Sequence, residues 1–213
     1  MKSKYEYIAI EGNIGAGKTT LSTILAERWK AKLILEQFSE NPFLPKFYQD
    51  PKRHAFSLEL SFMAERYRQL KEEVESRDLF QPQIVADYLF YKCRIFSLVN
   101  LDEDELTLYD TLFEILYANL PKPDIILYLH WPVTHLLENI AKRGRSYEQQ
   151  IEAAYLERIA QSYFDYFKSH LPCPVLILYA PAFDYLKNPD QIETIETLLE
   201  KAYDKKVYHL GFE

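Results

Sequence analysis

The 213-residue sequence predicts a doubly wound α/β fold, in which helices cover both faces of a parallel β-sheet. Two observations predict it. Short apolar runs of strand length recur along the chain, and segments with helical periodicity separate them. No internal repeat, low-complexity tract or Gly/Ser linker divides the sequence, so we expect a single domain over residues 1–213.

Five apolar runs are expected to form the sheet. They are residues 5–10 (YEYIAI), 33–36 (LILE), 83–87 (QIVAD), 124–130 (DIILYLH) and 174–179 (PVLILY). Nearly continuous apolar runs are typical of parallel strands that are buried on both faces. We therefore expect a five-stranded parallel sheet, with ligands bound at the carboxyl ends of its strands.

Three of the intervening segments have clear helical signals. Apolar residues recur at steps of three and four, first at Phe56, Leu60, Met63, Tyr67 and Leu70, and then at Leu106, Tyr109, Phe113, Leu116, Tyr117 and Leu120. This spacing gathers apolar side chains on one face of a helix. In the third segment, Pro132 fits a first helical turn, and Gly144 is a plausible stop after Arg143.

Composition excludes several kinds of partner. The net charge of −7 argues against nucleic acid or an anionic membrane. No apolar run has the length of a membrane span, and the N-terminal residues lack the apolar core of a signal peptide. Cys93 and Cys173 lack zinc-ligand spacing, so a reducing, cytoplasmic setting is the simplest interpretation.

A glycine-rich segment follows the first strand. Residues 12–19 (GNIGAGKT) match the pattern G-x-x-x-x-G-K-[ST] at every fixed position, and a helical segment comes next. Backbone N–H groups in such a loop bind phosphates together with the helix N-terminus. We expect Lys18 to reach the β- and γ-phosphates and Thr19 to ligate Mg²⁺.

The fold is therefore predicted to be a P-loop three-layer sandwich with a helical lid, and the cofactors to be ATP and Mg²⁺. The expected phosphate-binding residues are Gly12, Asn13, Ile14, Gly15, Ala16, Gly17, Lys18, Thr19 and Thr20.

Glu36 ends the second apolar run and is the candidate base. The sequence has no D-x-x-G switch and no N-K-x-D motif, which argues against a GTPase. A carboxylate at the end of this strand would lie near the transferred phosphate, where a kinase needs a proton acceptor for a hydroxyl. A strand-end glutamate exposed to solvent is the alternative.

Two further groups are candidates for substrate binding. Glu59, Phe62 and Arg66 share one helix face, where a carboxylate, a ring and a guanidinium can recognise a planar base. An ordinary solvated face is the alternative. Lys142, Arg143, Arg145 and Glu148 fall within residues 142–150, which we expect to form a lid over the phosphoryl group. A charged connection between helices is the alternative there.

In this order and spacing, the motifs resemble the deoxynucleoside kinases, a family that includes the deoxyadenosine, deoxyguanosine and deoxycytidine kinases and the insect multisubstrate enzyme. The bacterial branch is most similar. The resemblance covers nearly the whole chain and rests on GNIGAGKTT, Glu36 with NPFLPKFY, DPKRHAFSLELSFMAERYR, RGRSYE and PVLILYAPAFDYL.

The resemblance implies roles for residues around the acceptor nucleoside. Glu36 matches the base that takes the proton of the 5′-hydroxyl. Tyr48 and Glu148 match the residues that hold the deoxyribose 3′-hydroxyl. Arg66 matches an arginine that positions the base and the 5′-end. Phe38 and Phe62 fall near the region that stacks on the base.

On the donor side, the resemblance implies that Arg143 and Arg145 are lid arginines that contact the phosphates. Phe183 and Asp184 match a loop that borders the adenine of ATP. Members of this family are usually dimers, so the resemblance also implies a homodimer.

One departure from the family follows the third strand. Family members carry an acid, an arginine and a serine there, and the acid helps to hold Mg²⁺ through water. Asp87 keeps the acid, but Tyr88 stands where the arginine is expected. Lys92 and Arg94 are candidate substitutes. Without a substitute, a nucleotide-binding module that lacks catalysis is an alternative function.

A second departure is Glu59, where the family usually has glutamine. An ionised carboxylate only accepts hydrogen bonds, so it suits the N1–H and N2–H₂ groups of guanine. It conflicts with the ring acceptor of adenine or cytosine unless Glu59 is protonated or engaged by Arg66. The bacterial resemblance favours deoxyadenosine instead, so the choice between these purines stays open.

The predicted function is ATP-dependent phosphorylation of the 5′-hydroxyl of a purine deoxynucleoside, deoxyadenosine or deoxyguanosine, in nucleotide salvage. A nucleoside monophosphate kinase of the thymidylate type is the main rival. Its acceptor carries a phosphate, which the carboxylate of Glu36 would repel.

Overall fold

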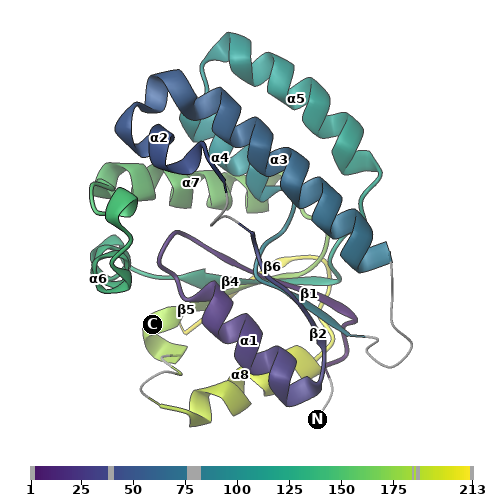
Figure 1. Ribbon diagram of the computed structural model, residues 1–213. Helices are drawn as coiled ribbons and strands as arrows, with labels where there is room; N and C mark the ends of the chain where they lie inside the picture. The colour runs from purple at the N-terminus through teal and green to yellow at the C-terminus, as the bar shows by residue number, and fades with distance from the viewer. Residues whose placement is uncertain (1–2, 38–40, 76–82, 184, 186–187, 212–213) are drawn as a thin grey trace.

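The computed structural model describes residues 3–37, 41–75, 83–183, 185 and 188–211. A six-stranded parallel sheet forms its centre, with the strand order β2-β3-β1-β4-β5-β6 (Figure 1). The strands are β1 (Tyr7–Gly12), β2 (Lys32–Ile34), β3 (Ile84–Ala86), β4 (Ile125–His130), β5 (Val175–Tyr179) and β6 (Val207–Leu210).

The predicted parallel α/β fold is confirmed, but the sheet has six strands rather than five. The additional strand, β6, pairs with β5 at one edge of the sheet. Its residues are half-buried or exposed, and His209 interrupts its apolar side chains. An edge strand of this kind lacks the continuous apolar run that marks a strand buried on both faces, so the pattern did not reveal it.

Helices cover both faces of the sheet (Figure 1). One face packs against α1 (Lys18–Trp29), α6 (Val133–Arg143) and α8 (Asp190–Glu200). The other is covered by α3 (Pro51–Glu75), α4 (Lys92–Asn100) and α7 (Ala153–Ser169), and α5 (Glu103–Ala118) packs on α3 and α4. The short helix α2 (Leu44–Gln49) lies against α3.

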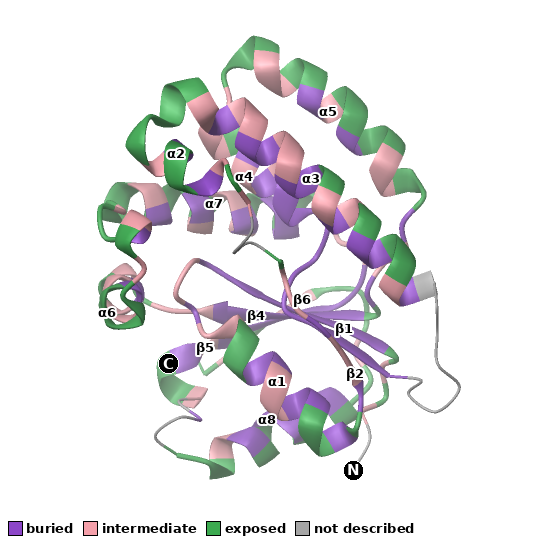
Figure 2. Cartoon of the chain, viewed as in Figure 1, coloured by how far each residue is buried: buried purple, intermediate pink, exposed green. Residues whose placement is uncertain are grey.

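The strands supply the core of both layers, and the four inner strands, β1, β3, β4 and β5, are almost entirely buried (Figure 2). In β1, Ala9 faces the α3 side, whereas Ile8 and Ile10 face the α1 side. Side chains alternate between the two faces of a strand, so each strand contributes to two hydrophobic clusters. Within the described ranges, no helix combines the length and the apolar content that a membrane crossing needs.

Helix ends match the local sequence signals. Gly144 ends α6 in the left-handed conformation, with a φ of 72°, as its position after Arg143 predicts. Pro132 is the N-cap of α6 and so precedes the first turn. Gly17, with a φ of 87°, is the N-cap of α1 and turns the chain from the glycine-rich loop into the helix.

Candidate active site

Two adjoining cavities lie around the loop between β1 and α1. The inner cavity is lined by Ile14, Gly15, Lys18, Thr19, Glu36, Leu44, Phe47, Tyr48, Leu58, Glu59, Phe62, Arg66, Asp87, Lys92, Phe96, Asn100, Arg143, Arg145, Glu148 and Tyr155. The loop cavity is lined by Gly15, Ala16, Gly17, Lys18, Thr19, Thr20, Leu33, Leu35, Glu36, Gln37, Gln69, Glu73, Asp87, Asn139, Arg143 and Arg145.

The residues that line both cavities mark the boundary between them. They are Gly15, Lys18, Thr19, Glu36, Asp87, Arg143 and Arg145. All of them are residues that the sequence singled out for phosphate, metal or proton chemistry. A phosphoryl group passing between two bound molecules would have to cross this boundary.

Packing against α6 fixes the glycine-rich loop. A Cβ atom on Gly15 would lie 2.8 Å from the carbonyl oxygen of Leu136, so no larger residue fits there. Asn139 Nδ2 donates to the carbonyl of Gly15 at 2.9 Å. Lys18 Nζ donates to the carbonyls of Gly12 and Asn13, both at 2.9 Å, so the ammonium lies within the loop. Burial, assisted by the nearby charge of Lys92, lowers the pKa of Lys18 to about 8.

Thr19 and Asp87 meet at the end of β3. Thr19 Oγ1 donates to Asp87 Oδ2 at 2.6 Å, so a hydroxyl and a carboxylate oxygen lie side by side. Hard oxygen donors of this kind fit Mg²⁺, which usually keeps water and phosphate ligands in addition to one or two protein oxygens. The described residues hold no cluster of three or more His, Cys, Asp or Glu side chains suited to a metal. A cation here would therefore need phosphate or water oxygens as well.

Glu36 is held between two cations. Its Oε1 accepts from Arg66 Nη2 at 2.5 Å, and its Oε2 accepts from Lys92 Nζ at 2.6 Å. All three side chains are nearly buried, since Glu36 is 13% exposed, Arg66 5% and Lys92 7%. The backbone N–H of Glu36 also donates to Asp87 Oδ1 at 2.7 Å. Glu36 is thus an enclosed residue rather than a solvent-exposed strand end.

The charge state of Glu36 follows from these neighbours. Burial alone would raise the pKa of its carboxyl, but Lys92 and Arg66 outweigh that effect and hold the pKa well below its ordinary value. Glu36 is therefore ionised throughout the physiological pH range. An ionised carboxylate is ready to accept a hydrogen bond from a hydroxyl.

Glu59, Phe62 and Arg66 line the inner cavity from α3. All three are buried, so this helix face is not solvated. The Arg66 guanidinium lies over the ring of Phe62, 4.7 Å from its centroid. Arg66 Nη1 also donates to the sulfur of Cys93 at 3.1 Å. The arginine is therefore anchored on three sides, by Glu36, Phe62 and Cys93.

Glu59 has a different environment from Glu36. Asn100 Nδ2 donates to Glu59 Oε1 at 2.6 Å, whereas Oε2 is buried and has no partner in the described structure. Burial raises the pKa of Glu59 to about 7, although Asn100 and the charge of Arg66 oppose the rise. Asn100 had no signal in the sequence, because it lies in another helix and only the packing of α4 on α3 brings it here.

Arg143, the last residue of α6, and Arg145, just after the helix, line both cavities. Glu148 is buried and pairs with Arg143 and, at 3.2 Å, with Arg145. Tyr48 lines the inner cavity beside them, and its ring stacks on that of Tyr147 with 5.8 Å between centroids. The two arginines, Glu148 and Tyr48 therefore gather around one end of the inner cavity, while Lys142 is exposed.

Comparison with known proteins agrees with this geometry. The sequence profile of the family described as Deoxynucleoside kinase matches residues 8–203. The chain belongs to this family. It is similar to the deoxyguanosine kinase of Bacillus subtilis, with 42% identity over 158 residues, 74% of this chain and 76% of that protein. It is 33% identical to the deoxyadenosine/deoxycytidine kinase of the same organism, over 90% of each chain.

A solved structure extends the likeness to three dimensions. The structure of deoxyadenosine kinase from M. mycoides with bound dATP covers 91% of this chain at a TM-score of 0.78, with 28% identity. This deoxynucleoside kinase family member is thus an enzyme, a kinase with a nucleoside substrate. A binding module without catalysis is not supported.

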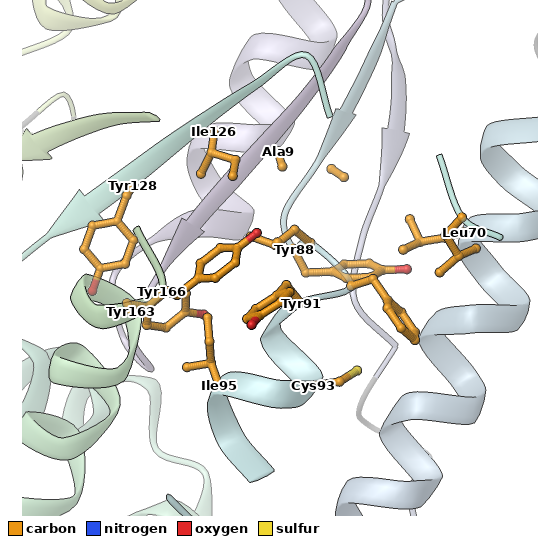
Figure 3. Packing of buried hydrophobic residues seen from close by; sticks show 14 of the residues in the cluster. Ala9, Leu70, Tyr88, Tyr91, Cys93, Ile95, Ile126, Tyr128, Tyr163 and Tyr166 are labelled. Carbon is orange, nitrogen blue, oxygen red and sulfur yellow. The ribbon is translucent and has the colours of Figure 1, made fainter. Parts of the chain in front are cut away.

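The two candidate substitutes for the arginine expected after Asp87 have different environments, and so does Tyr88. Tyr88 is fully buried in the core between the sheet and helices α3, α4 and α7, and it lines neither cavity (Figure 3). Its hydroxyl donates to Gln69 Oε1 at 2.7 Å. Arg94 faces away from the site and pairs with both carboxylate oxygens of Asp110, at 2.9 and 3.0 Å. Of the two candidates, Lys92 alone lies in the inner cavity.

Three predicted residues are not part of the described site. Phe38 and Asp184 lie outside the described residues. Phe183 is half-buried against the α1 side of the core and lines neither cavity. Its neighbour Tyr185 does reach the loop, where its hydroxyl donates to the carbonyl of Gly17 at 3.1 Å.

Glu11 is a supporting residue that sequence reasoning missed. It is fully buried, and its carboxylate accepts from the N–H groups of Gly12 at 3.1 Å and Leu89 at 2.8 Å. The hydroxyl of Tyr163 donates to it at 2.7 Å. Glu11 therefore joins the phosphate loop to the segment that carries Lys92. A lone acid inside an apolar strand was the available signal, because a buried carboxylate needs such partners.

Proposed function

We propose that this kinase transfers the γ-phosphoryl group of ATP to the 5′-hydroxyl of a purine deoxynucleoside in nucleotide salvage, and that residues 1–213 act as a single domain. The nucleoside would bind in the inner cavity and ATP along the loop cavity. One observation carries the proposal. Glu36, an enclosed and ionised carboxylate, lies at the boundary of the two cavities, beside the lysine of the phosphate loop.

The chemistry follows from that position. A 5′-hydroxyl at the boundary would donate its hydrogen bond to Glu36, which orients the oxygen lone pairs toward phosphorus and accepts the proton as the bond forms. Lys18 and the loop amides would hold the β- and γ-phosphates. Thr19 and Asp87 would hold Mg²⁺, which supplies charge neutralisation on the phosphates.

The segment over residues 142–150 would act as the lid. Arg143 and Arg145 line both cavities, so they are within reach of a phosphoryl group at the boundary. Their present partner is Glu148, the residue proposed to bind the 3′-hydroxyl together with Tyr48. Binding of a deoxyribose at Glu148 would weaken its hold on the arginines, which links occupancy by the nucleoside to charge stabilisation.

A purine is favoured for two reasons. The relatives named above are, by their names, kinases of deoxyguanosine, deoxyadenosine and deoxycytidine, so purines predominate among them. Glu59 offers a hydrogen-bond acceptor that suits the adjacent N1–H and N2–H₂ groups of guanine, a purine.

The test is a phosphorylation assay with ATP and Mg²⁺. Deoxyadenosine, deoxyguanosine, deoxycytidine and thymidine are compared with their 5′-monophosphates. We expect turnover on the purine deoxynucleosides and none on the monophosphates. Turnover on monophosphates alone would assign the rival thymidylate-type activity, and a pyrimidine preference would contradict the proposed base.

We also propose that the enzyme is a cytoplasmic homodimer. Leu98, Leu108, Leu112 and Ile115 on α4 and α5 are large apolar residues that are 36–60% exposed. They give the outer side of these helices an apolar surface suited to burial against a second copy. Light scattering at micromolar concentration tests this, since a monomer mass of 25.3 kDa would contradict it.

A further inference from the structure

The inner cavity contains an unpaired acceptor. Glu59 Oε2 is buried and has no hydrogen-bond partner in the described part of the chain. The partner oxygen, Oε1, already accepts from Asn100 Nδ2 at 2.6 Å. A buried acceptor without a partner is unfavourable, so a ligand that brings an N–H group to Oε2 gains affinity.

The position of this acceptor is fixed. The hydroxyl of Tyr109 donates to the backbone carbonyl of Glu59 at 3.3 Å, which ties this turn of α3 to α5. Asn100 is in turn hydrogen-bonded to Tyr155 of α7. Asn100 therefore decides which carboxylate oxygen of Glu59 is occupied by protein and which one faces a ligand.

A donor lies on the same helix face. Arg66 has five N–H groups, of which three bond to Glu36 and Cys93. Among the described residues, the other two N–H groups of the guanidinium have no hydrogen-bond partner, and Arg66 lines the inner cavity. An acceptor oxygen beside guanidinium donors is complementary to the N1–H and O6 edge of a 6-oxopurine, where a donor and an acceptor are adjacent.

We propose that Glu59, positioned by Asn100, selects 6-oxopurine deoxynucleosides over 6-aminopurine ones, so that deoxyguanosine and deoxyinosine are the preferred substrates. This inference rests on the proposed kinase function. Glu59 Oε2 accepts from N1–H, and Arg66 donates to O6. Adenine instead presents the lone pair of N1 to the carboxylate, which leaves two acceptors in contact.

The protonation state of Glu59 provides an independent readout. Burial raises its pKa to about 7. The groups that face it are Arg66 from α3, Lys92, Cys93 and Asn100 from α4, Glu36 after β2, Tyr109 from α5 and Tyr155 from α7. A protonated Glu59 can donate to N1 of adenine. Discrimination in favour of guanine should therefore grow as the pH rises through about 7.

The first experiment is competition. Wild-type enzyme receives ATP, Mg²⁺ and equal deoxyguanosine and deoxyadenosine, and both monophosphates are quantified between pH 6 and 8. The ratio of kcat/KM values should favour deoxyguanosine at pH 8 and rise roughly 10-fold from pH 6 to 8. A constant ratio, or a preference for deoxyadenosine at pH 8, overturns the inference, whereas no turnover on any deoxynucleoside defeats the proposed function instead.

Base analogues repeat the test without altering the protein. Deoxyinosine keeps N1–H and O6 but lacks the 2-amino group, and its kcat/KM should stay within about 10-fold of deoxyguanosine. The 2-aminopurine deoxynucleoside keeps the 2-amino group but has an unprotonated N1, and it should be phosphorylated as poorly as deoxyadenosine. The reverse order would assign recognition to the 2-amino group and overturn the inference.

A variant pair isolates Asn100. Asn100→Leu keeps the side-chain shape but frees Glu59, so the preference for deoxyguanosine should fall roughly 10-fold, through KM rather than kcat. Asn119→Leu, at the exposed C-cap of α5, is the matched control and should keep the wild-type ratio. In Glu59→Gln the ratio should lose its pH dependence. If Asn100→Leu keeps both the ratio and its pH dependence, Asn100 has no positioning role.

Discussion

Glu36 and Glu59 are two carboxylates of one cavity, and their neighbours give them opposite properties. Glu36 is bracketed by Arg66 and Lys92, which hold its pKa well below the ordinary value. Glu59 has an amide on one oxygen and, among the residues that the structure describes, no partner on the other, and burial raises its pKa to about 7. Residue type alone would make them equivalent.

The difference separates reaction chemistry from recognition. A carboxylate that is always charged suits the hydroxyl that must lose a proton during phosphoryl transfer. A carboxylate with an unpaired oxygen suits a base whose N–H group can complete it. Pairs of acids whose environments push their pKa values apart are a recurring way for one site to hold two roles.

The variant Glu36→Gln tests most directly whether Glu36 accepts the proton of the hydroxyl. The amide keeps the shape of the side chain but cannot accept the hydroxyl proton, so kcat should fall by roughly 10²–10⁴-fold. ATP should still bind, because Lys18 and the loop amides are unchanged. Steady-state kinetics gives kcat, and isothermal titration calorimetry gives the ATP dissociation constant.

Glu72→Gln is the control for that variant. Glu72 lies on α3 with its side chain 64% exposed, and its change should leave kcat unaltered. A kcat of Glu36→Gln within a few-fold of wild type would remove Glu36 from proton transfer. Loss of ATP binding would instead indicate that the ion pairs of Glu36 with Arg66 and Lys92 are needed for the structure of the site.

A smaller effect is expected for Lys92→Met. The change removes one of the two cations on Glu36 while keeping most of the side-chain length, and kcat should fall by roughly 10²-fold. Lys92→Arg restores a cation and should recover part of the loss. Lys168→Met, at a 74% exposed position, is the matched control. Equal kcat values for Lys92→Met and wild type would mean that Arg66 alone is sufficient to hold Glu36.

The sequence could predict the parts of this comparison that depend on local pattern. The phosphate loop is a contiguous motif, and Glu59 and Arg66 share a helix face by spacing alone. Five of the six strands were also predictable, since their apolar runs are nearly continuous. For the same reason the edge strand Val207–Leu210 was not.

The partners of the two carboxylates were less accessible to sequence reasoning. Lys92 and Arg94 were both predicted only as substitutes for the arginine absent after Asp87, and packing places Lys92 on Glu36 and Arg94 on Asp110. Asn100 had no motif, since its contact with Glu59 spans 41 positions and depends on how α4 packs on α3. Long-range packing therefore sets the charge states that distinguish Glu36 from Glu59.

The raised pKa of Glu59 can be tested by measuring how the free energy of unfolding depends on pH. Its pKa is raised from the ordinary value of 4.5 for a glutamate to about 7, so the unfolded chain loses this proton first as the pH rises. Stability from this group is complete below about pH 4.5 and is lost as the pH rises toward 7. Relative to Glu59→Gln, wild type should lose roughly 2 kcal/mol of unfolding free energy between pH 5 and 8.

Urea unfolding of both proteins at the two pH values measures this difference. Glu72→Gln serves again as the control, because an exposed carboxyl should leave the pH dependence of wild type in place. Parallel pH profiles for wild type and Glu59→Gln would show that Glu59 ionises normally. The contrast with Glu36 would then rest on hydrogen bonding alone.

The smallest expected effect concerns Tyr88, the residue beside Asp87. Its substitution tests whether Tyr88 helps to position Glu36. Its hydroxyl donates to Gln69, and Gln69 Nε2 donates to the carbonyl of Leu35, next to Glu36. Tyr88→Phe should cost about 1 kcal/mol in urea unfolding, because Gln69 loses a buried donor. The kcat should stay within about 2-fold of wild type, since Asp87, Arg66 and Lys92 still hold Glu36. A 10-fold loss of kcat would mean that the position of Glu36 depends on this buried chain of hydrogen bonds as well as on its two cations.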